Sequence, residues 1–275
     1  MNVAYHLQKL GVESSLISSV GDDEQGHELL GFAKEIGLPT DTIQVCRTSA
    51  TSEVIATVDE EHQVSYEILF PVAWDFIRWE ESFSALLQKS SALVYGSLAS
   101  RHEQSAGTLS RMLHSDCLKV FDVNLRAPHY TPETIHRLLD AADILKLNEE
   151  ELEIISSWSE PNLRTEAEQV QAIFKNFKMQ EILLTKGADG ASYYTSDQKL
   201  DSPAFKVNVE DTIGSGDSFL AAFLSKKLQN EDPATALEYA VAMGAFITSQ
   251  SGACPAYQKA DFETFLSNKR QEFKI

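Results

Sequence analysis

The chain of 275 residues carries a formal net charge of −18 at pH 7, and 43% of its residues are hydrophobic. This content suffices for one large α/β core with a small appended sheet, whereas the acidic balance argues against nucleic acid and anionic membranes, which attract clustered Lys and Arg. Three isolated cysteines and the lack of a signal-peptide core predict a cytoplasmic protein with reduced thiols, namely Cys46, Cys117 and Cys254.

The first forty residues alternate between predicted helix and strand. The pattern predicts a helix over residues 3–10, a strand over residues 14–19 and a helix over residues 23–36. Gly37 and the following Leu-Pro-Thr end the second helix. Such alternation is typical of the βαβ units that build a parallel sheet.

The pattern then changes to consecutive strands. Runs rich in β-branched residues occupy residues 43–47, 51–58 and 64–68 with no helix between them, and residues 59–63 form a polar hairpin tip. We expect an antiparallel group that packs over the main sheet as a small lid, spanning residues 41–71. The alternative is that these strands simply extend the core.

From residue 91 onward, strands and helices alternate again. Strands are predicted over residues 92–95, 118–123, 144–147, 181–185 and 191–195. The carboxyl ends of parallel strands meet at one edge of a sheet, where ligand-binding groups usually lie. Candidate residues at the end of the strand over residues 118–123 are Asp122, Asn124 and Arg126. For Asp122, Asn124 and Arg126, a turn-forming or salt-bridged role fits the sequence about as well.

Asn148 and Glu151 open the helix that follows the third of these strands. An Asn followed three residues later by a Glu is an ordinary capping box, in which each side chain accepts a hydrogen bond from a backbone N–H group. Taken alone, this pair indicates capping and requires no metal ion.

The segment Asp211-Thr-Ile-Gly-Ser-Gly-Asp217 carries the strongest chemical signal in the chain. Its glycines let the backbone turn tightly and approach a ligand, and residues 218–224 predict a helix that begins there. The unpaired N–H groups at a helix amino terminus attract phosphate oxygens. Asp217 is placed to accept a proton from an attacking hydroxyl group. The alternative is a glycine loop whose Asp merely caps the helix.

Other familiar motifs are absent from the sequence. The chain has no Walker A loop, and Phe219 stands where a dinucleotide-binding fingerprint requires its third glycine. Its histidines lack the spacing of a zinc site, and there is no Gly-x-Ser-x-Gly nucleophile elbow. Beyond the glycine segment, a second helix is predicted over residues 233–249.

Two distant motifs together resemble one family. The segment 211–217, followed by Ala-Ala-Phe-Leu, resembles the carboxyl-terminal signature of the PfkB, or ribokinase-like, family of carbohydrate kinases. Asn2-x-Ala4, Gly11 and the run Gly21-Asp-Asp-x-x-Gly26 are similar to its amino-terminal motif. The resemblance implies a three-layer α/β/α sandwich with a mainly parallel central sheet and a small β-sheet lid, in which residues 1–40 and 72–275 form the core.

The resemblance also implies roles for individual residues. It makes Asp217 the catalytic base and the amides of Gly214, Ser215 and Gly216 an anion hole. It implies ATP contacts from Asn148, Glu151, Thr185, Lys186, Gly187, Gly190, Gly252 and Ala253. It implies sugar contacts from Asn2, Gly96, Asp122, Asn124 and Arg126. It further implies that Glu151 helps to order Mg²⁺ and that a K⁺ site involves Asp211, Ile213 and Gly252.

We therefore expect an ATP-dependent carbohydrate kinase that phosphorylates a primary hydroxyl group. Fructose is the first substrate hypothesis, from the similarity of Asp122-x-Asn124-x-Arg126 to fructokinase-like members, while ribose and a 2-keto-3-deoxy sugar acid stay open. A catalytically silent nucleotide- or sugar-binding protein is the alternative from another class. In several members the lid pairs two subunits, so a homodimer is expected.

The chain begins where the family pattern is already under way. Relatives normally carry two glycines just before the position of Asn2, so we expect roughly thirty residues to be missing, the scale of one strand with its connections. In relatives that segment holds the first strand of the sheet, and its loss is expected to leave a gap in the core.

Overall fold

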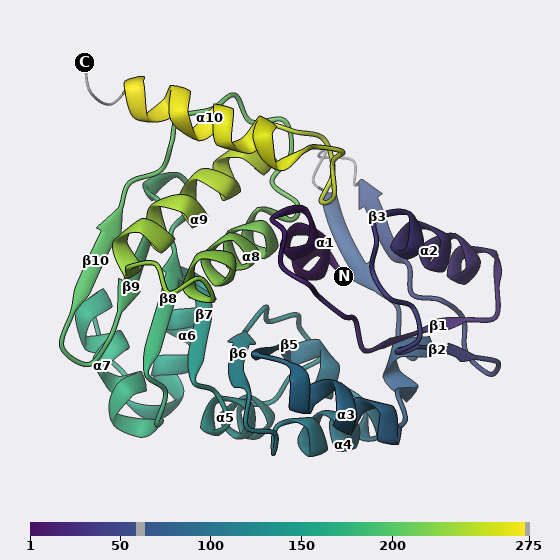
Figure 1. Cartoon of the computed structure of the whole chain (residues 1–275). Helices are drawn as coiled ribbons and strands as arrows, with labels where there is room; N and C mark the ends of the chain where they lie inside the picture. Colours follow the sequence, from purple (N-terminus) through teal and green to yellow (C-terminus); the bar gives the residue numbers. More distant parts are fainter. Residues whose placement is uncertain (59–63, 273–275) are drawn as a thin grey trace.

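The computed structural model describes residues 1–58 and 64–272, and it arranges them in three sheets flanked by helices (Figure 1). The predicted hairpin tip at residues 59–63 lies outside the described residues. No helix in the described part of the chain is long and apolar enough to cross a membrane.

The largest sheet has six strands in the order β10-β9-β8-β7-β6-β5. Its members are β5 (Ala92–Gly96), β6 (Leu118–Asp122), β7 (Ile144–Asn148), β8 (Glu181–Thr185), β9 (Ala191–Tyr194) and β10 (Lys199–Ser202). The strands β5 to β8 are parallel, and β9 and β10 continue the sheet in antiparallel fashion. The prediction of a mainly parallel central sheet is confirmed.

Helices cover both faces of this sheet. Val120 and Ile144 pack in a core cluster with α8 (Ser215–Lys227) and α9 (Pro233–Thr248), whereas their neighbours Phe121 and Leu145 pack in a second cluster. The first cluster also takes in α1 (Asn2–Lys9) and α10 (Lys259–Glu272). The second takes in α3 (Glu81–Lys89), α4 (Glu103–Met112), α5 (Pro132–Asp140), α6 (Glu149–Ser159) and α7 (Glu166–Asn176). Because these strands are buried on both faces, apolar residues on neighbouring positions pack into opposite clusters, which confirms the three-layer α/β/α class.

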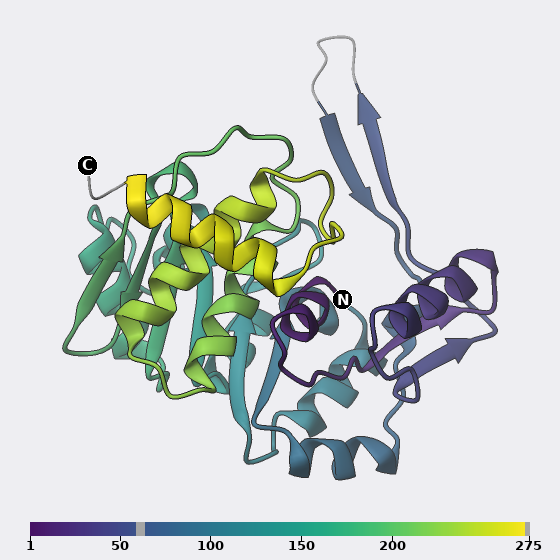
Figure 2. The same ribbon diagram turned by 45° about the horizontal axis from the view of Figure 1, so that its top comes forward.

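Two smaller sheets involve the amino-terminal region. The strand β1 (Ser18–Gly21) pairs in parallel with β2 (Ile43–Cys46), and α2 (Glu24–Glu35) connects them. Within the described residues, the strand β3 (Val54–Val58) pairs with β4 (Val64–Ile68) alone, and these antiparallel strands project away from the rest of the molecule in Figure 2.

The prediction that residues 43–47 join the antiparallel group was wrong. The helix α2 crosses over between β1 and β2, which is the connection that parallel strands require. The strand predicted over residues 14–19 also begins later, at Ser18. Residues 41–71 thus contain two separate strand pairings, and their division from the core as a lid stays a prediction.

The motif Gly21-Asp-Asp-x-x-Gly26 folds into a closed junction at the start of α2. Asp23 Oδ1 accepts from Gly26 N and its Oδ2 accepts from Thr51 N, both at 2.8 Å. Thr51 Oγ1 in turn accepts from Gly21 N at 2.8 Å. A Cβ atom on Gly26 would lie 2.2 Å from Gly21 O, so only glycine fits this position. These contacts fasten the chain leading into β3 to the beginning of α2.

Three short 3₁₀ helices complete the described structure: η1 (Ala73–Phe76), η2 (Ser97–Ser100) and η3 (Gly187–Asp189). η2 begins directly after β5, and η3 directly follows β8 and Lys186.

Candidate active site

The carboxyl ends of the central strands bring the predicted polar residues to one edge of the sheet. In the strand registers, Gly96 lies beside Asp122, Asp122 beside Lys146, and Asn148 beside Thr185. This placement agrees with the expectation that ligand-binding groups gather at the carboxyl edge of parallel strands.

The glycine turn forms the amino terminus of α8. Gly214 has φ +79°, and a Cβ atom there would lie 2.8 Å from Ala253 Cα, so both the backbone conformation and the packing require glycine. No side chain caps this helix, and among the described residues no acceptor takes the backbone N–H of Gly216 or Asp217. A helix end with open donors and a positive dipole suits a phosphate group.

Asp217 lies in the first turn of α8 and receives a hydrogen bond from the other end of the chain. Asn2 Nδ2 donates to Asp217 Oδ2 at 2.8 Å, and Cys254 Sγ lies 3.5 Å from Asn2 Oδ1. The two distant signature motifs therefore meet at this carboxylate. The Asn2 amide fixes one carboxylate oxygen, and the predicted sugar-contact residue lies beside the predicted base.

Asp122 forms a buried ion pair with Lys146 on the neighbouring strand. Lys146 Nζ lies 2.9 Å from Asp122 Oδ1. Burial raises the pKa of Asp122 to about 6, although Lys146 opposes this rise. Burial lowers the pKa of Lys146, but nearby carboxylates led by Asp122 outweigh it and raise the pKa overall. Both directions are compatible with an ionised pair at pH 7.

Asn148 and Glu151 form the capping box that the sequence indicated. Asn148 Oδ1 accepts from Glu151 N at 2.8 Å, and Glu151 Oε2 accepts from Asn148 N at 2.9 Å. Glu151 Oε1 also accepts from Leu125 N at 2.9 Å. Glu151 is buried, so its carboxylate joins the start of α6 to the loop after β6.

Asp211 gathers the residues of the predicted cation site. Its Oδ1 accepts from Ile213 N at 2.9 Å, and its Oδ2 accepts from Gly252 N at 3.1 Å. Among the described residues, no group of three or more His, Cys, Asp or Glu side chains is arranged to hold a metal ion. The side chains at this edge of the sheet therefore fit Mg²⁺ only as an ion whose ligands are mainly nucleotide phosphate oxygens and water.

Several predicted residues have other partners in the structure. Lys186 Nζ lies 2.8 Å from Glu166 Oε2 and 3.7 Å from Asp201 Oδ1, on the side of α7 and β10. Arg126 is exposed, and its Nη1 donates to the neighbouring Leu125 carbonyl. Asn124 has φ 43° and its carbonyl accepts from Ser97 Oγ at 2.9 Å, as a turn-forming residue would.

The turn after β8 depends on its glycines. Gly187 and Gly190 both have positive φ, at 53° and 96°. A Cβ atom on Gly190 would lie 2.1 Å from Ser202 O, so the backbone of β10 approaches too closely for any other residue. The structural interpretation of this turn is sufficient to explain both glycines.

Sequence reasoning missed two buried polar residues near the glycine turn at the start of α8, namely Lys146 and His6. His6 Nε2 lies 3.0 Å from Ala253 O and its Nδ1 lies 3.0 Å from Tyr257 Oη. Burial lowers the pKa of His6 to about 4. Since Ala253 packs on Gly214, α1 supports the glycine turn. A lone charge in an apolar strand signalled Lys146, but nothing local signalled His6, because its partners lie some 250 residues away.

Comparisons with known proteins agree with this arrangement. The model of the family described as pfkB family carbohydrate kinase matches residues 1–260. A probable fructokinase-5 of Arabidopsis thaliana is 30% identical over 288 residues, covering 98% of this chain and 87% of the relative.

Two solved structures share the fold. A fructokinase with bound ATP from Xylella fastidiosa superposes with a TM-score of 0.87 and 22% identity, covering 98% of this chain and 89% of that one. A fructokinase from Vibrio cholerae O395, in a form with bound fructose, ADP and calcium ion, superposes with a TM-score of 0.84 and 24% identity, covering 96% and 89% of the two chains.

Proposed function

Because the chain belongs to the pfkB family of carbohydrate kinases, we propose that it transfers the γ-phosphoryl group of ATP to a primary hydroxyl group of fructose. The observation that carries this proposal is the uncapped amino end of α8, which has open N–H donors and holds Asp217 in its first turn. The donors suit a phosphate group, and the carboxylate suits a proton acceptor beside it.

In the proposed reaction, Asp217 accepts the proton of the sugar hydroxyl as its oxygen attacks the γ-phosphorus. The bond between that phosphorus and the bridging oxygen of ADP breaks, and ADP leaves with the electron pair. The N–H groups of Gly214, Gly216 and Asp217 donate to the phosphoryl oxygens, where charge is concentrated in the transition state. The predicted third amide, Ser215 N, donates to Thr212 O at 3.3 Å and would have to leave it to join them. Asn2 holds the carboxylate in place, leaving one oxygen for the hydroxyl group.

Nucleotide and metal binding are assigned to the same edge of the sheet. We assign ATP to the residues Asn148, Thr185, the turn from Gly187 to Gly190, and Gly252 with Ala253. When bound, Mg²⁺ neutralises charge on the ATP phosphates, and Glu151 helps to order its water shell. A monovalent cation, K⁺, is assigned to Asp211, Ile213 and Gly252. Lys186 keeps its proposed nucleotide role only if it leaves Glu166.

The choice of fructose rests on two supports. The Vibrio cholerae relative holds fructose, and the run Asp122-x-Asn124-x-Arg126 resembles that of fructokinase-like members. Gly96 and Asp122 are neighbours at the carboxyl edge of the sheet, and the Asp217 carboxylate acts on the pKa of Asp122. Ribose and a 2-keto-3-deoxy sugar acid are the competing substrates, and an aldose such as ribose offers a different arrangement of hydroxyl groups to the same residues.

We assign residues 41–71 the role of a lid over the core, through which two copies pair. Four large apolar side chains in and beside these strands are substantially exposed: Val45 (43%), Val54 (58%), Ile55 (42%) and Phe70 (49%). Exposed apolar surface of this kind favours contact with another protein surface.

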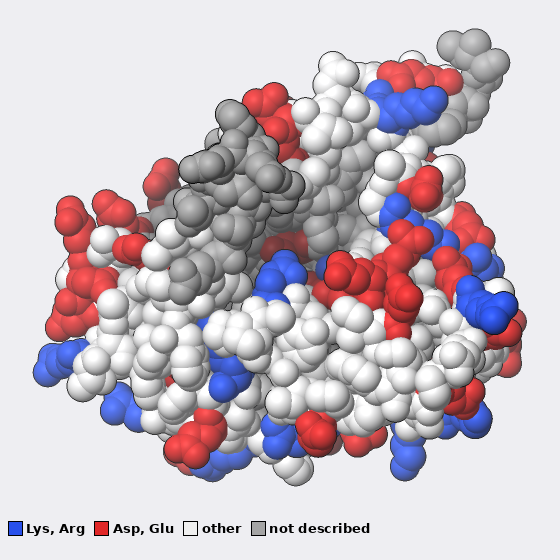
Figure 3. Space-filling model, turned by 180° about the vertical axis from the view of Figure 1, so that it is seen from behind, with Lys and Arg blue, Asp and Glu red and all other residues white. Residues whose placement is uncertain are grey.

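In Figure 3, acidic and basic side chains are interspersed over the visible face, as suits small-molecule partners better than nucleic acid.

The proposed function is tested by phosphoryl transfer from radiolabelled ATP to a panel of fructose, ribose, glucose and 2-keto-3-deoxygluconate. We expect fructose to give the highest kcat/KM, and Asp217→Asn to lower kcat by about 10³-fold or more without unfolding the protein. Transfer to no sugar would favour the silent binding protein. An unchanged rate in the Asp217→Asn variant would contradict the assigned base.

A further inference from the structure

Lys146 is a lone charge in an apolar strand, and the proposed chemistry gives it no task. The strand β7 reads Ile-Leu-Lys-Leu-Asn, and Lys146 is only 8% exposed. Removing an ammonium group from water costs several kcal/mol, and a packed apolar side chain often stabilises a core as well as a buried ion pair does. Stability alone therefore does not account for a lysine at this position.

The ammonium group of Lys146 is not saturated by its ion pair. An ammonium has three N–H donors. Within the described residues, the single hydrogen-bond acceptor for them is Asp122 Oδ1, at 2.9 Å. The remaining donors lie at the carboxyl edge of the sheet, where α8 begins.

Gly216 shows where the ammonium group lies. A Cβ atom on Gly216 would be 2.9 Å from Lys146 Nζ and 3.7 Å from its Cε. Gly216 has no positive φ, unlike Gly214. Glycine is thus required at position 214 by the backbone conformation, whereas a side chain at position 216 would displace the end of the Lys146 side chain. The space left by the missing side chain is what lets Lys146 lie against the first turn of α8.

The charges around this turn are mostly negative. The carboxylates of Asp122, Glu151 and Asp217 all act on the pKa of Lys146. A phosphate group at the open N–H donors would therefore lie beside the carboxylate of Asp217, while the negative charge of Asp122 and Glu151 acts on the Lys146 ammonium group. Lys146 carries a positive charge next to the first turn of α8. It therefore offsets the repulsion between these carboxylates and a phosphate group bound at that turn.

We propose that Lys146 is a positioning residue of the phosphoryl-transfer site. Its buried ammonium group braces the first turn of α8 from beneath Gly216 and supplies fixed positive charge to the anion hole that the backbone N–H groups form. The inference rests on the proposed function of that turn. It predicts that loss of the charge weakens phosphate binding and slows phosphoryl transfer, and that sugar binding changes through Asp122, the assigned sugar contact with which Lys146 pairs.

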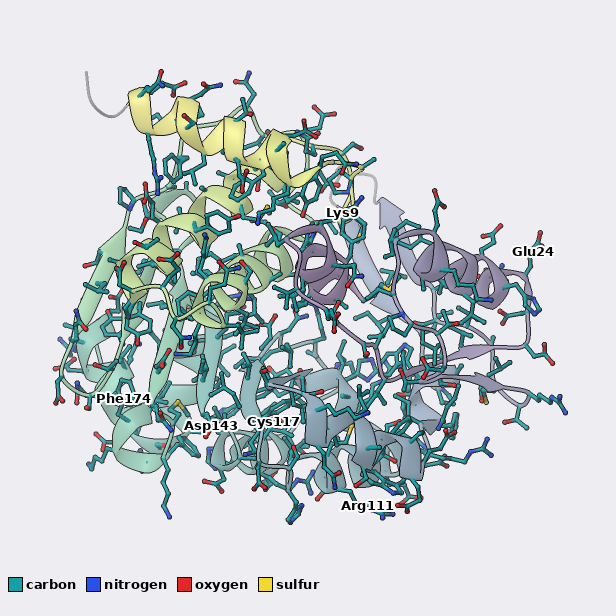
Figure 4. All side chains as sticks on the ribbon, in the orientation of Figure 1. Lys9, Glu24, Arg111, Cys117, Asp143 and Phe174 are labelled. Carbon is teal, nitrogen blue, oxygen red and sulfur yellow. The ribbon has the colours of Figure 1, made fainter. Side chains whose placement is uncertain are left out.

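The test compares Lys146→Met with Lys119→Met in the full chain. Lys119 lies in β6, the strand that also holds Asp122. Its Nζ atom lies 3.8 Å from Asp143 Oδ2, at the opposite end of the strand. Asp143 and Cys117, both labelled in Figure 4, lie near the lower end of the six-stranded sheet in that view. The control therefore removes a longer and more exposed ion pair, at the edge of the sheet opposite to the first turn of α8.

The measurements are the dissociation constant of inorganic phosphate by calorimetry, and kcat and sugar KM with ATP. We expect Lys146→Met to weaken phosphate binding about tenfold and to lower kcat about 10²-fold, and we expect sugar KM to rise as well because Asp122 loses its partner. Lys119→Met should stay within about twofold of the parent in both. Lys146→Arg keeps the charge and should recover part of the loss.

Because Lys146→Met leaves Asp122 buried without a partner, Asp122→Asn and the double variant Lys146→Met/Asp122→Asn are measured as well. Phosphate binding should persist in the Asp122→Asn variant and weaken in the double variant. Folded Lys146 variants that keep phosphate affinity, or an equal loss in Lys119→Met, would overturn the proposal. If the parent chain phosphorylates no sugar, the proposed function fails, and the phosphate-binding comparison still decides the role of Lys146.

Discussion

The molecule uses glycine at two helix starts for opposite purposes. At the start of α2, Gly21 and Gly26 make room for the protein itself: Thr51 and Asp23 occupy the space and satisfy the backbone donors. At the start of α8, Gly214 and Gly216 make an equally tight turn, but the N–H groups of Gly216 and Asp217 have no acceptor within the described chain.

The difference lies in the donors rather than in the glycines. A junction whose hydrogen bonds are closed internally contributes to stability, whereas a junction with open donors at a helix amino terminus is available to a ligand. Both motifs belong to the family signature, yet only the second has the form of a binding site. Changes at the two junctions are therefore expected to separate activity from stability.

The largest effect is expected at the open junction. Gly214→Ala would force a Cβ atom to within 2.8 Å of Ala253 and place alanine at φ +79°. We expect displacement of the N–H donors and a fall in kcat of about 10²- to 10³-fold, measured by phosphoryl transfer from ATP. A folded Gly214→Ala protein with the parental rate would show that this turn is structural, like the one at α2.

Acidification should weaken the support of the open junction. Burial lowers the pKa of His6 from 6.5 to about 4, so the unfolded chain takes up a proton that the folded chain refuses. The free energy of unfolding should fall as the pH drops from about 6.5 to about 4, by up to roughly 3 kcal/mol. Urea unfolding at several pH values measures this, and His6→Gln should flatten the dependence. An equally steep dependence in the variant would exclude His6 as its source.

The closed junction should respond in stability alone. Thr51→Val removes the hydroxyl group that accepts from Gly21 N and leaves that buried N–H group unpaired. We expect a loss of about 2 kcal/mol in the free energy of unfolding, with kcat per folded molecule unchanged. Thr51→Ser keeps the hydroxyl group and should lose less. A large fall in kcat for Thr51→Val would mean that the two junctions are coupled.

The smallest expected effect is a gain. Gly31 lies on the exposed side of α2, where a Cβ atom would meet nothing within 4 Å. Gly31→Ala should raise the free energy of unfolding by about 0.5–1 kcal/mol, because alanine favours helix and the unfolded chain loses freedom. Substitution of glycine by alanine thus distinguishes Gly31, which no contact or backbone conformation requires, from the glycines that the turns require. Destabilisation by Gly31→Ala would reveal a contact that the structure does not contain.

The features predictable from sequence were those with local signals. Strand alternation located the carboxyl edge of the sheet, the spacing of Asn148 and Glu151 gave the capping box, and the glycines of segment 211–217 gave the start of α8. The resemblance then supplied the three-layer fold and the family. These signals work because periodicity, caps and glycine turns are decided within a few residues.

The remaining features depend on contacts that no short segment contains. The pairing of β2 with β1 competes with its pairing to β3, and packing decides between them. In the sequence, His6 is a polar residue on a short helix, and only the folded chain brings Ala253 and Tyr257 into contact with it. Lys146 was visible as a charge in β7, but only the space at Gly216 shows what it lies against.

The hydrogen bond between Asn2 and Asp217 also constrains the order in which the protein folds. It joins residues 215 positions apart, and the contacts of Tyr5 and His6 with Pro255 and Ala253 span 250 and 247. During synthesis at about 5–20 residues per second, α1 waits roughly 10–50 s for these partners to emerge. We therefore expect the carboxylate of Asp217 to meet Asn2 only after most of the chain has been synthesised.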